Sequence, residues 1–200
     1  EAKRIVEHAN SMSAIAAGCG MSWCEDTRKV IETVIREVEI PLVLDADALN
    51  VISEYPEILH TRKAPTILTP HPGEMARLCS KTISEVQADR IGAALSFSKQ
   101  YGVITVLKGA YTVIATNDGR VYFNETGNSG LSRGGSGDML TGIIGALLAQ
   151  GIPAEKAAVS GVYLHGLSAD LCAQKMSQYA MLATDVIESL SDAFLQIKGR

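Results

Sequence analysis

Residues 26–47, with the sequence DTRKVIETVIREVEIPLVLDAD, contain a helix pattern followed directly by a strand pattern. In the first half, apolar residues recur at the 3.6-residue spacing of a helix that packs one face against a core. Pro41 then precedes the compact apolar run 42–44, which stops at Asp45 and is typical of a short strand buried on both faces. The stretch therefore predicts a helix over 26–37 and a strand of a covered sheet after it.

The same alternation continues along the chain. Helices must cover both faces of a sheet built from such strands, and the Asp-Gly pair at 118–119 predicts a hairpin turn. The pattern thus predicts an α/β fold in three layers, a mostly parallel sheet flanked by helices with an antiparallel hairpin at one edge. Further strand patterns lie at 66–68, 103–107, 111–115 and 120–123, and further helix patterns at 2–9, 73–79, 84–101, 138–150, 153–174 and 181–196.

Composition limits the class of protein. The chain has 200 residues, of which 46% are hydrophobic, and this suits one domain with a sizeable core. A net charge of −4 and 5% aromatic residues argue against nucleic-acid binding, which needs a basic surface with stacking aromatic rings. Apolar stretches such as 143–149 are far shorter than the roughly 20 residues that span a bilayer, so no membrane association is expected and the cytoplasm is the expected location.

The distribution of special residues adds two expectations. The four cysteines and four histidines are scattered without a C-x-x-C motif, which argues against a disulfide framework or a zinc site. His165 lies on a helix of small residues and is predicted as a packing histidine whose polar atoms have hydrogen-bond partners. Because the chain opens with Glu1 and enters a helical pattern at once, residues 1–200 are expected to be one domain that lacks its N-terminal portion.

The strongest functional signal is residues 127–138, GNSGLSRGGSGD, which open into an apolar helix. Such a loop exposes backbone N–H groups at the positive end of the helix dipole, and this favours phosphate. A purely structural carboxylate at Asp138 would repel phosphate, so a catalytic role is favoured, with an N-cap as the alternative. The sequence matches neither the Walker A motif, which needs Lys after the glycines, nor the G-x-S-x-G nucleophile elbow.

A second signal is the sequence TPHPGE at residues 69–74, directly after a predicted strand. Its two prolines stiffen the turn and present His71 and Glu74 at the strand end. His71 can hydrogen-bond a ligand there, and Glu74 can orient water around Mg²⁺. The alternative is a structural turn with an acidic residue in the first turn of a helix.

Two more strand ends carry polar residues. Lys108 and Gly109 follow an apolar strand, where Lys offers a point charge for phosphate and Gly permits close backbone approach. A solvated lysine is the alternative. Asp45, Asp47 and Asn50 follow the strand at 42–44 and either bind a metal or a ligand hydroxyl, or cap the next helix.

Four motifs, and their order along the chain, resemble those of the ADP/ATP-dependent NAD(P)H-hydrate dehydratases. These are ribokinase-like proteins that repair hydrated nicotinamide cofactors. They are LDADAL at 44–49, TPHPGE at 69–74, VLKG at 106–109 and GGSGD at 134–138. The resemblance covers the chain from about residue 14 to about residue 188. It implies a ribokinase-like sandwich, in agreement with the α/β pattern.

The resemblance also implies a role for each matching residue. The family's Gly-Pro-Gly-Leu-Gly turn appears here as Gly18-Cys-Gly-Met-Ser22, which keeps Gly20 as a substrate contact but loses the proline and the last glycine. The residues implied are Asp138 as the catalytic residue; Lys108, Gly109, Ala110, Tyr111, Thr112, Gly135 and Gly137 for the nucleotide; Gly20, His71 and Asp138 for the hydrate; and Glu74 in the outer shell of Mg²⁺.

The activity implied is the nucleotide-dependent dehydration of hydrated NADH and NADPH back to NAD(P)H, a carbon–oxygen lyase reaction with ADP or ATP as co-substrate and Mg²⁺. Two alternatives stay open, a ribokinase-like kinase of a small alcohol and a non-catalytic nucleotide-binding module. We also expect a homo-oligomer. The resemblance further implies an N-terminal portion, either as a separate segment or with a fused epimerase domain.

Overall fold

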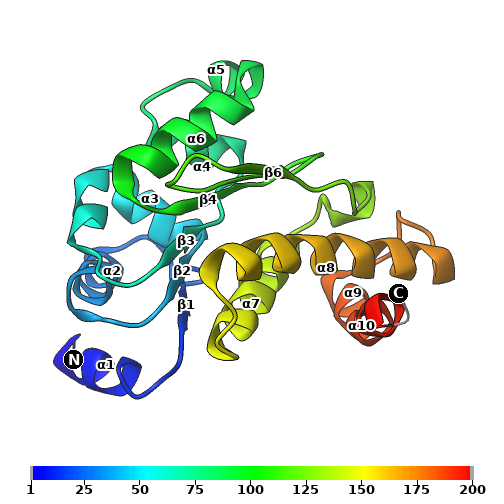
Figure 1. Ribbon diagram of the computed structural model, residues 1–200, viewed down its shortest axis with the longest axis horizontal. Coiled ribbons are helices and arrows are strands. Elements are labelled where there is room, and N and C mark those ends of the chain that lie inside the picture. Colours follow the sequence, from blue (N-terminus) through cyan, green and yellow to red (C-terminus); the bar gives the residue numbers. More distant parts are fainter. Residues whose placement is uncertain (1, 199–200) are drawn as a thin grey trace.

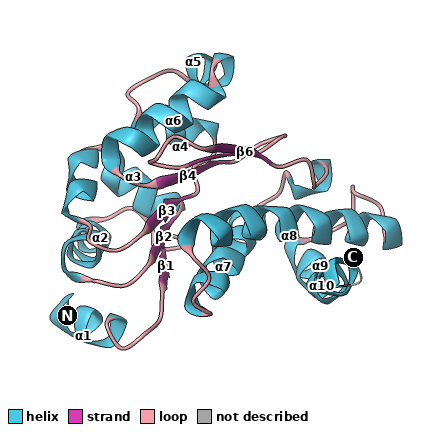
Figure 2. Cartoon of the chain, viewed as in Figure 1, coloured by secondary structure: helices cyan, strands magenta, loops and turns pink. Residues whose placement is uncertain are grey.

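Six short strands form a single sheet whose order in space follows their order in the chain. The first four run parallel and the last two form an antiparallel hairpin at one edge, which confirms the predicted arrangement. The computed structural model describes residues 2–198 and places the sheet between two layers of helices (Figures 1 and 2). The strands are β1 (Ile15–Ala17), β2 (Leu42–Leu44), β3 (Thr66–Leu68), β4 (Ile104–Leu107), β5 (Val113–Ala115) and β6 (Val121–Phe123).

Helices connect the parallel strands and follow the hairpin. Within residues 2–198, no helix combines the length and the apolar character needed to cross a membrane. The helices are α1 (Ala2–Ala9), α2 (Glu25–Glu37), α3 (Ala46–Ser53), α4 (Pro72–Leu78), α5 (Ile83–Ala88), α6 (Arg90–Tyr101), α7 (Ser136–Ala149), α8 (Ala154–Lys175), α9 (Ala183–Glu188) and α10 (Leu190–Lys198), with the 3-10 turns η1 (Pro56–Thr61) and η2 (Ser129–Leu131).

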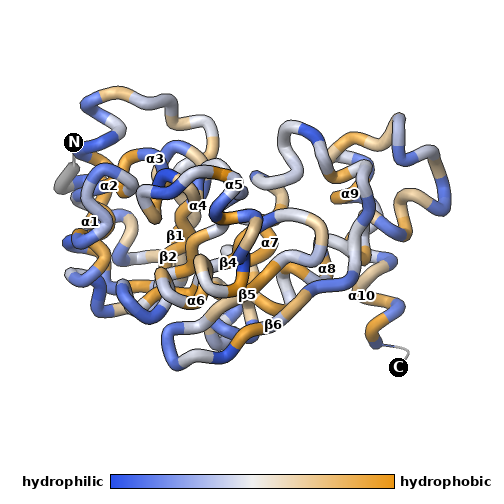
Figure 3. The backbone as a smooth tube through the Cα atoms, turned by 90° about the horizontal axis from the view of Figure 1, so that it is seen from above, coloured by the Kyte–Doolittle hydropathy of each residue, from blue (hydrophilic) through white to orange (hydrophobic). Residues whose placement is uncertain are grey.

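The side chains of each strand alternate between two hydrophobic cores, one on each face of the sheet. Leu42 and Leu44 of β2 pack with α2, α3, α4 and α6, whereas Val43 packs with α7 and α8 on the other face. All three side chains are fully buried, which explains why β2 is a continuous apolar run. Figure 3 shows the same arrangement as hydrophobic colours along the strands inside more hydrophilic outer turns.

Two of the predicted helices are each divided in the structure. The prediction of one helix over 84–101 is wrong because Asp89 leaves the helical conformation and its carboxylate accepts a hydrogen bond from the Gly92 N–H at 2.8 Å. Asp89 thereby begins α6 just after it ends α5. The prediction of one helix over 181–196 is also wrong, since Ser189, which keeps helical backbone angles, separates α9 from α10 as a turn.

The carboxyl ends of the four parallel strands lie at one edge of the sheet. Hydrogen bonds continue beyond the strands there, from Asp45 N–H to the Ala17 carbonyl (3.1 Å) and from Lys108 N–H to the Pro70 carbonyl (2.8 Å). The first strand end comes especially close, since a Cβ at Gly18 would lie 1.8 Å from the Asp45 carbonyl oxygen. The motifs singled out in the sequence therefore meet at this edge.

Candidate functional site

The ends of β2 and β4 and the start of α4 bring three charged side chains together. The Lys108 Nζ lies 2.7 Å from Oδ1 of Asp45 and 3.7 Å from Oε2 of Glu74. Asp45 is 1% exposed and Glu74 is 5% exposed, so the pairing offsets the cost of burying charge. The sequence suggests Lys108 as a charge for phosphate, and the structure adds that two buried carboxylates already share its ammonium.

Asp45 connects several elements through one carboxylate. Its Oδ1 accepts hydrogen bonds from the Ala46 N–H (2.9 Å) and from Lys108, and its Oδ2 accepts one from the Thr141 hydroxyl (2.8 Å). The capping interpretation is therefore confirmed, since Asp45 is the N-cap of α3. In addition, the same side chain fixes Lys108 and the first turns of α7.

The other two polar residues of this motif stabilise neighbouring segments. Asp47 Oδ2 accepts a hydrogen bond from the Ser22 N–H at 2.9 Å, and Asn50 Oδ1 accepts two from the guanidinium of Arg77. The contact to Asp47 holds the turn after β1, where Ser22 adopts a positive φ of 62°. Both residues thus have structural partners.

His71 is held rigidly at the start of α4, as its two flanking prolines predict. Its Nδ1 accepts hydrogen bonds from the N–H groups of Gly73 (2.9 Å) and Glu74 (3.3 Å), and the Glu74 Oε2 accepts one from the His71 N–H (2.6 Å). Because Nδ1 is an acceptor, the proton of the neutral ring lies on Nε2. Nε2 lies 3.5 Å from Oε1 of Glu74 and half of the side chain is exposed, so the Nε2–H is held at the strand end beside this carboxylate.

Asp138 is the third residue of α7 and is exposed. One of its carboxylate oxygens, an oxygen of Asp45 and the Cys19 sulfur all lie within 4.8 Å of one another. Burial, and then a hydrogen bond with Asp138, raise the pKa of the Cys19 thiol to about 12, so this thiol stays protonated. Asp138 therefore faces the turn after β1 with a neutral thiol beside it.

Gly137 lies between the carboxylate of Asp138 and a cavity. A Cβ at Gly137 would lie 3.3 Å from the Lys108 Nζ and 3.5 Å from the Asp45 Oδ2, so the absence of a side chain lets the ion pair lie under the helix start. The first N–H groups of a helix have no partner within the helix. Backbone donors, an ammonium and the Asp138 carboxylate thus meet around one glycine.

The cavity has a volume of about 540 Å³ and opens beside Gly137. It contains the predicted nucleotide turn 108–112, whereas Gly135, predicted as a phosphate contact, lies outside its lining. A second hollow of about 860 Å³, mostly apolar, lies between α1, β1 and α2, and of the motif residues it includes only Met21 of the turn after β1. The 540 Å³ cavity is lined by Lys108, Gly109, Ala110, Tyr111, Thr112, Asn124, Glu125, Thr126, Gly127, Asn128, Ser129, Leu131, Ser132, Ser136, Gly137, Leu140, Val162, His165 and Gly166.

One wall of this cavity joins residues 124–126, which sequence reasoning missed, to the first residues of the glycine-rich loop 127–138. Residues 124–129 are held against α8 by Asp170, whose carboxylate accepts hydrogen bonds from the Gly127 N–H (2.8 Å) and the Asn128 Nδ2 (3.0 Å). A close approach helps, since a Cβ at Gly166 would lie 2.2 Å from the Thr126 hydroxyl oxygen. In the sequence, Gly127 indicates the start of a phosphate-binding loop, whereas in the structure it lies at the contact with Asp170.

His165 is buried, as predicted, but the prediction that its polar atoms are satisfied is wrong, and the ring is part of the cavity. Its Nε2 has no hydrogen-bond partner within residues 2–198, and burial lowers the pKa of the imidazole to about 4. At neutral pH the ring is therefore uncharged. It adds a polar but neutral group next to Ser136 and Gly137.

The chain resembles known proteins in both sequence and structure. A model of the family described as NAD(P)H-hydrate dehydratase matches residues 1–192. A bifunctional NAD(P)H-hydrate repair enzyme of Thermofilum pendens is 40% identical over 196 residues. The structure of the ADP/ATP-dependent NAD(P)H-hydrate dehydratase from Bacillus subtilis, co-crystallized with ATP/Mg²⁺, aligns with a TM-score of 0.84 and 34% identity over 96% of this chain and 69% of that chain.

A ribokinase-like superfamily protein from Enterococcus faecalis aligns with a TM-score of 0.80 and 26% identity, over 94% of this chain and 64% of that one. The predicted ribokinase-like fold is thereby confirmed. The chain is shorter than its relatives. The match to the Thermofilum protein covers 98% of this chain but 37% of that protein.

Proposed function

Since this chain belongs to the NAD(P)H-hydrate dehydratase family, we propose that it uses ADP or ATP to convert hydrated NADH and NADPH back to NADH and NADPH. The observation that carries the proposal is the arrangement around Gly137. On one side lies a cavity of about 540 Å³, and on the other lies the exposed carboxylate of Asp138. A phosphoryl group at the helix start would reach both sides.

The adenine nucleotide is proposed to occupy the cavity along residues 108–112. The volume lies within the usual range for small-molecule sites of about 300–1,000 Å³. Its phosphates would then point at the start of α7, where free N–H groups and the Lys108 ammonium favour negative charge. Lys108 lies under Gly137 rather than in open solvent, so it is pre-positioned for this contact.

The hydrate is proposed to bind on the other side, between Asp138, His71 and the turn at Gly20. Gly20 has a φ of +67° and open space around its α-carbon, so a ligand can approach the backbone there. The fixed Nε2–H of His71 would donate a hydrogen bond to the substrate. This placement assigns the two ligands to different strand ends.

The reaction proposed is phosphoryl transfer followed by elimination. Asp138 accepts the proton of the C6 hydroxyl while that oxygen bonds to the transferring phosphorus and the phosphorus–oxygen bond of the nucleotide breaks. The N–H groups at the start of α7, including that of Gly137, stabilise the charge on the phosphoryl oxygens. The C6–oxygen bond then breaks with loss of phosphate, the neighbouring ring carbon loses a proton, and the dihydronicotinamide is restored.

Mg²⁺ is proposed to enter with the nucleotide, and the donor set fits this mode of binding. Magnesium prefers oxygen ligands and keeps several waters. Asp45 and Glu74 share the Lys108 ammonium, and the protonated Cys19 is a poor ligand, so these side chains do not form an inner-sphere set. Glu74 Oε1 is the carboxylate oxygen proposed to hold a water of the outer shell. The bound ion would neutralise phosphate charge.

The experiment that tests the proposal supplies NADH hydrate with ADP or ATP and Mg²⁺. Recovery of NADH absorbance together with release of inorganic phosphate is the expected result. A stable phosphorylated product without NADH would instead indicate the kinase of a small alcohol. Nucleotide binding without any turnover would indicate the non-catalytic binding module.

A further inference from the structure

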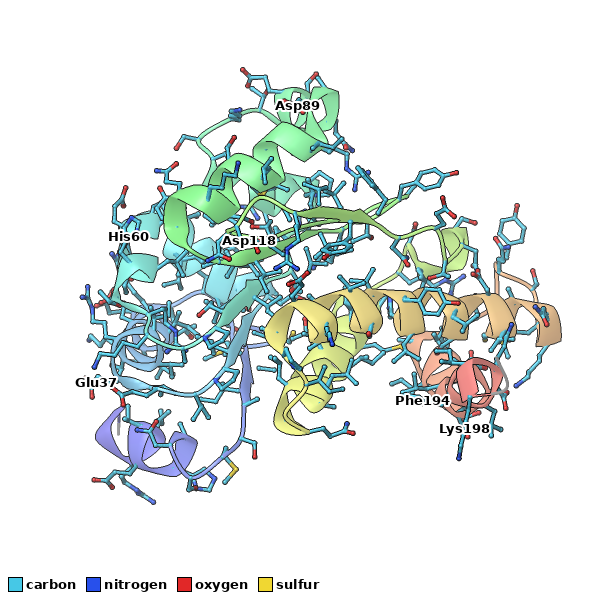
Figure 4. All side chains as sticks on the ribbon, in the orientation of Figure 1. Glu37, His60, Asp89, Asp118, Phe194 and Lys198 are labelled. Carbon is cyan, nitrogen blue, oxygen red and sulfur yellow. The ribbon has the colours of Figure 1, made fainter. Side chains whose placement is uncertain are left out.

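Arg90, the first residue of α6, reaches the turn that follows β4. Its Nη1 donates a hydrogen bond to the Ala110 carbonyl at 2.6 Å, and its Nη2 donates to the carbonyls of Leu107 (3.1 Å) and Lys108 (3.3 Å). Figure 4 labels the preceding residue, Asp89, at the junction of α5 and α6. One guanidinium therefore binds three carbonyls of four consecutive residues, 107–110.

Local helix chemistry does not favour arginine at this position. A cation in the first turn of a helix is opposed by the helix dipole. The Nε of Arg90 is also buried without a hydrogen-bond partner within residues 2–198, and a buried unpaired donor costs free energy. What the side chain provides in return is a fixed conformation of the 107–110 backbone.

That backbone is strained and needs support. Tyr111 has a φ of +53°, a left-handed conformation that is unfavourable for a residue with a side chain, and Gly109 before it has a φ of +139°, which only glycine adopts readily. Tyr111 is 67% exposed, so burial does not repay this cost. Strain that the surroundings hold in place is concentrated at functional sites.

The strained turn is a wall of the cavity. Lys108, Gly109 and Tyr111 all line it, and a Cβ at Gly109 would lie 3.0 Å from the Arg90 Nη2. The guanidinium thus packs directly against the turn that faces the cavity. Any change in its three hydrogen bonds would move this wall.

We propose that Arg90 is a positioning residue for the nucleotide: it holds residues 108–112 in the conformation that binds the adenine nucleotide, without contributing to the chemistry at Asp138. The inference rests on the proposed function, because it takes the occupant of the cavity to be an adenine nucleotide.

The chain offers a matched control in Arg62. Its Nη2 donates to the Ile40 carbonyl at 2.7 Å, its Nη1 donates to the Val38 carbonyl, and its Nε donates to the Thr66 hydroxyl at 3.0 Å. These contacts lie before β2 and at the start of β3, at the opposite end of the strands from the cavity. Arg62 is therefore a part-buried arginine that binds backbone carbonyls without touching the site.

The experiment compares Arg90→Lys with Arg62→Lys in the full chain, by calorimetric titration with Mg-ADP and by steady-state kinetics. Lysine keeps the charge but has one nitrogen in place of the planar fork, so it cannot reproduce the contacts that Nη1 and Nη2 make to three carbonyls. Arg90→Lys is expected to raise the Kd for Mg-ADP and the KM for the nucleotide by about tenfold, the equivalent of one charge-assisted hydrogen bond. The KM for the hydrate and kcat at saturating nucleotide should stay within about twofold of wild type, a change well below one hydrogen bond.

Arg62→Lys should lower the Tm and leave the Kd for Mg-ADP unchanged. An unaltered Kd in Arg90→Lys would overturn the inference, and so would an equal loss of affinity in both variants. If Arg90→Lys does not fold, Arg90→Gln is measured in the same way and judged by the same outcomes. Wild-type protein that does not bind Mg-ADP would contradict the proposed function itself, and the inference with it.

Discussion

Lys108 and Asp45, 63 positions apart in the chain, form a 2.7 Å ion pair directly beneath Gly137. The pair lies where the proposed nucleotide cavity ends and the acidic group around Asp138 begins. Asp45 also holds α7 through the Thr141 hydroxyl. One buried carboxylate thus joins the end of β4, through Lys108, to α7, through Thr141.

Adding a methyl group at Gly137 should disturb this pair. The Cβ of Gly137→Ala would lie 3.3 Å from the Lys108 Nζ, so the ammonium must shift. We expect a higher KM for the nucleotide and a lower kcat. Gly142→Ala is the matched control on the same helix, because nothing lies within 4 Å of its Cβ. That variant should be stabilised by up to about 1 kcal/mol with unchanged kinetics, and loss of activity in both variants would argue against the special role of Gly137.

Removing the ammonium should destabilise the fold. Lys108→Met leaves the 1%-exposed Asp45 carboxylate without its partner, which is expected to lower the free energy of unfolding in urea by about 3–5 kcal/mol. The double variant Asp45→Asn/Lys108→Met should be more stable than Lys108→Met alone, since the unpaired carboxylate is gone. If Lys108→Met and the double variant are equally stable, the loss of stability does not come from leaving the Asp45 carboxylate unpaired.

The two cysteines around the turn after β1 should differ in reactivity. Burial, and a hydrogen bond with Asp138, raise the pKa of Cys19 to about 12, whereas hydrogen bonding with Thr27 lowers the pKa of the exposed Cys24. Since the thiolate is the nucleophile, iodoacetamide at pH 8 should alkylate Cys24 first and Cys19 much more slowly. Mass spectrometry of the labelled peptides measures both rates. Labelling of Cys19 at the rate of Cys24 would be inconsistent with a half-buried Cys19 thiol whose pKa is raised beside the carboxylates of Asp45 and Asp138.

The role of His71 can be separated from its structural role. His71→Asn keeps an acceptor for the N–H groups of Gly73 and Glu74, so stability should change little. Asparagine has no donor at the position of Nε2. The KM for the hydrate should therefore rise while the Kd for Mg-ADP stays unchanged. Weaker nucleotide binding with an unaltered KM for the hydrate would place His71 at the other ligand.

Much of the fold could be predicted because buried parallel strands leave a direct mark in the sequence. The run 42–44 is apolar at every position since β2 is covered on both faces, and the motifs after the strands meet because parallel strands end at one edge. Helix breaks are less visible, since the only signal at Asp89 is an acidic residue three positions before Gly92, whose missing side chain leaves room for the capping carboxylate.

Some of the candidate site could not be predicted. Arg90 donates to backbone carbonyls. Because every residue has a carbonyl, the sequence does not indicate which residues are the partners of Arg90. Lys108 illustrates the same limit, because its pairing with Asp45 depends on how two strand ends come together in space. Residues 124–129 form a cavity wall only because Asp170 of α8 holds them there.

The central claim is that Asp138 is the base of the reaction while the nucleotide binds on the other side of Gly137. Asp138→Asn tests it most directly, because asparagine keeps the shape of the side chain but is a very weak base. The measurement is the rate of NADH recovery from its hydrate at saturating ADP or ATP, together with the Kd for the nucleotide. We expect turnover to fall by about 10²–10⁴-fold with the Kd nearly unchanged. Turnover within a few-fold of wild type would contradict the account.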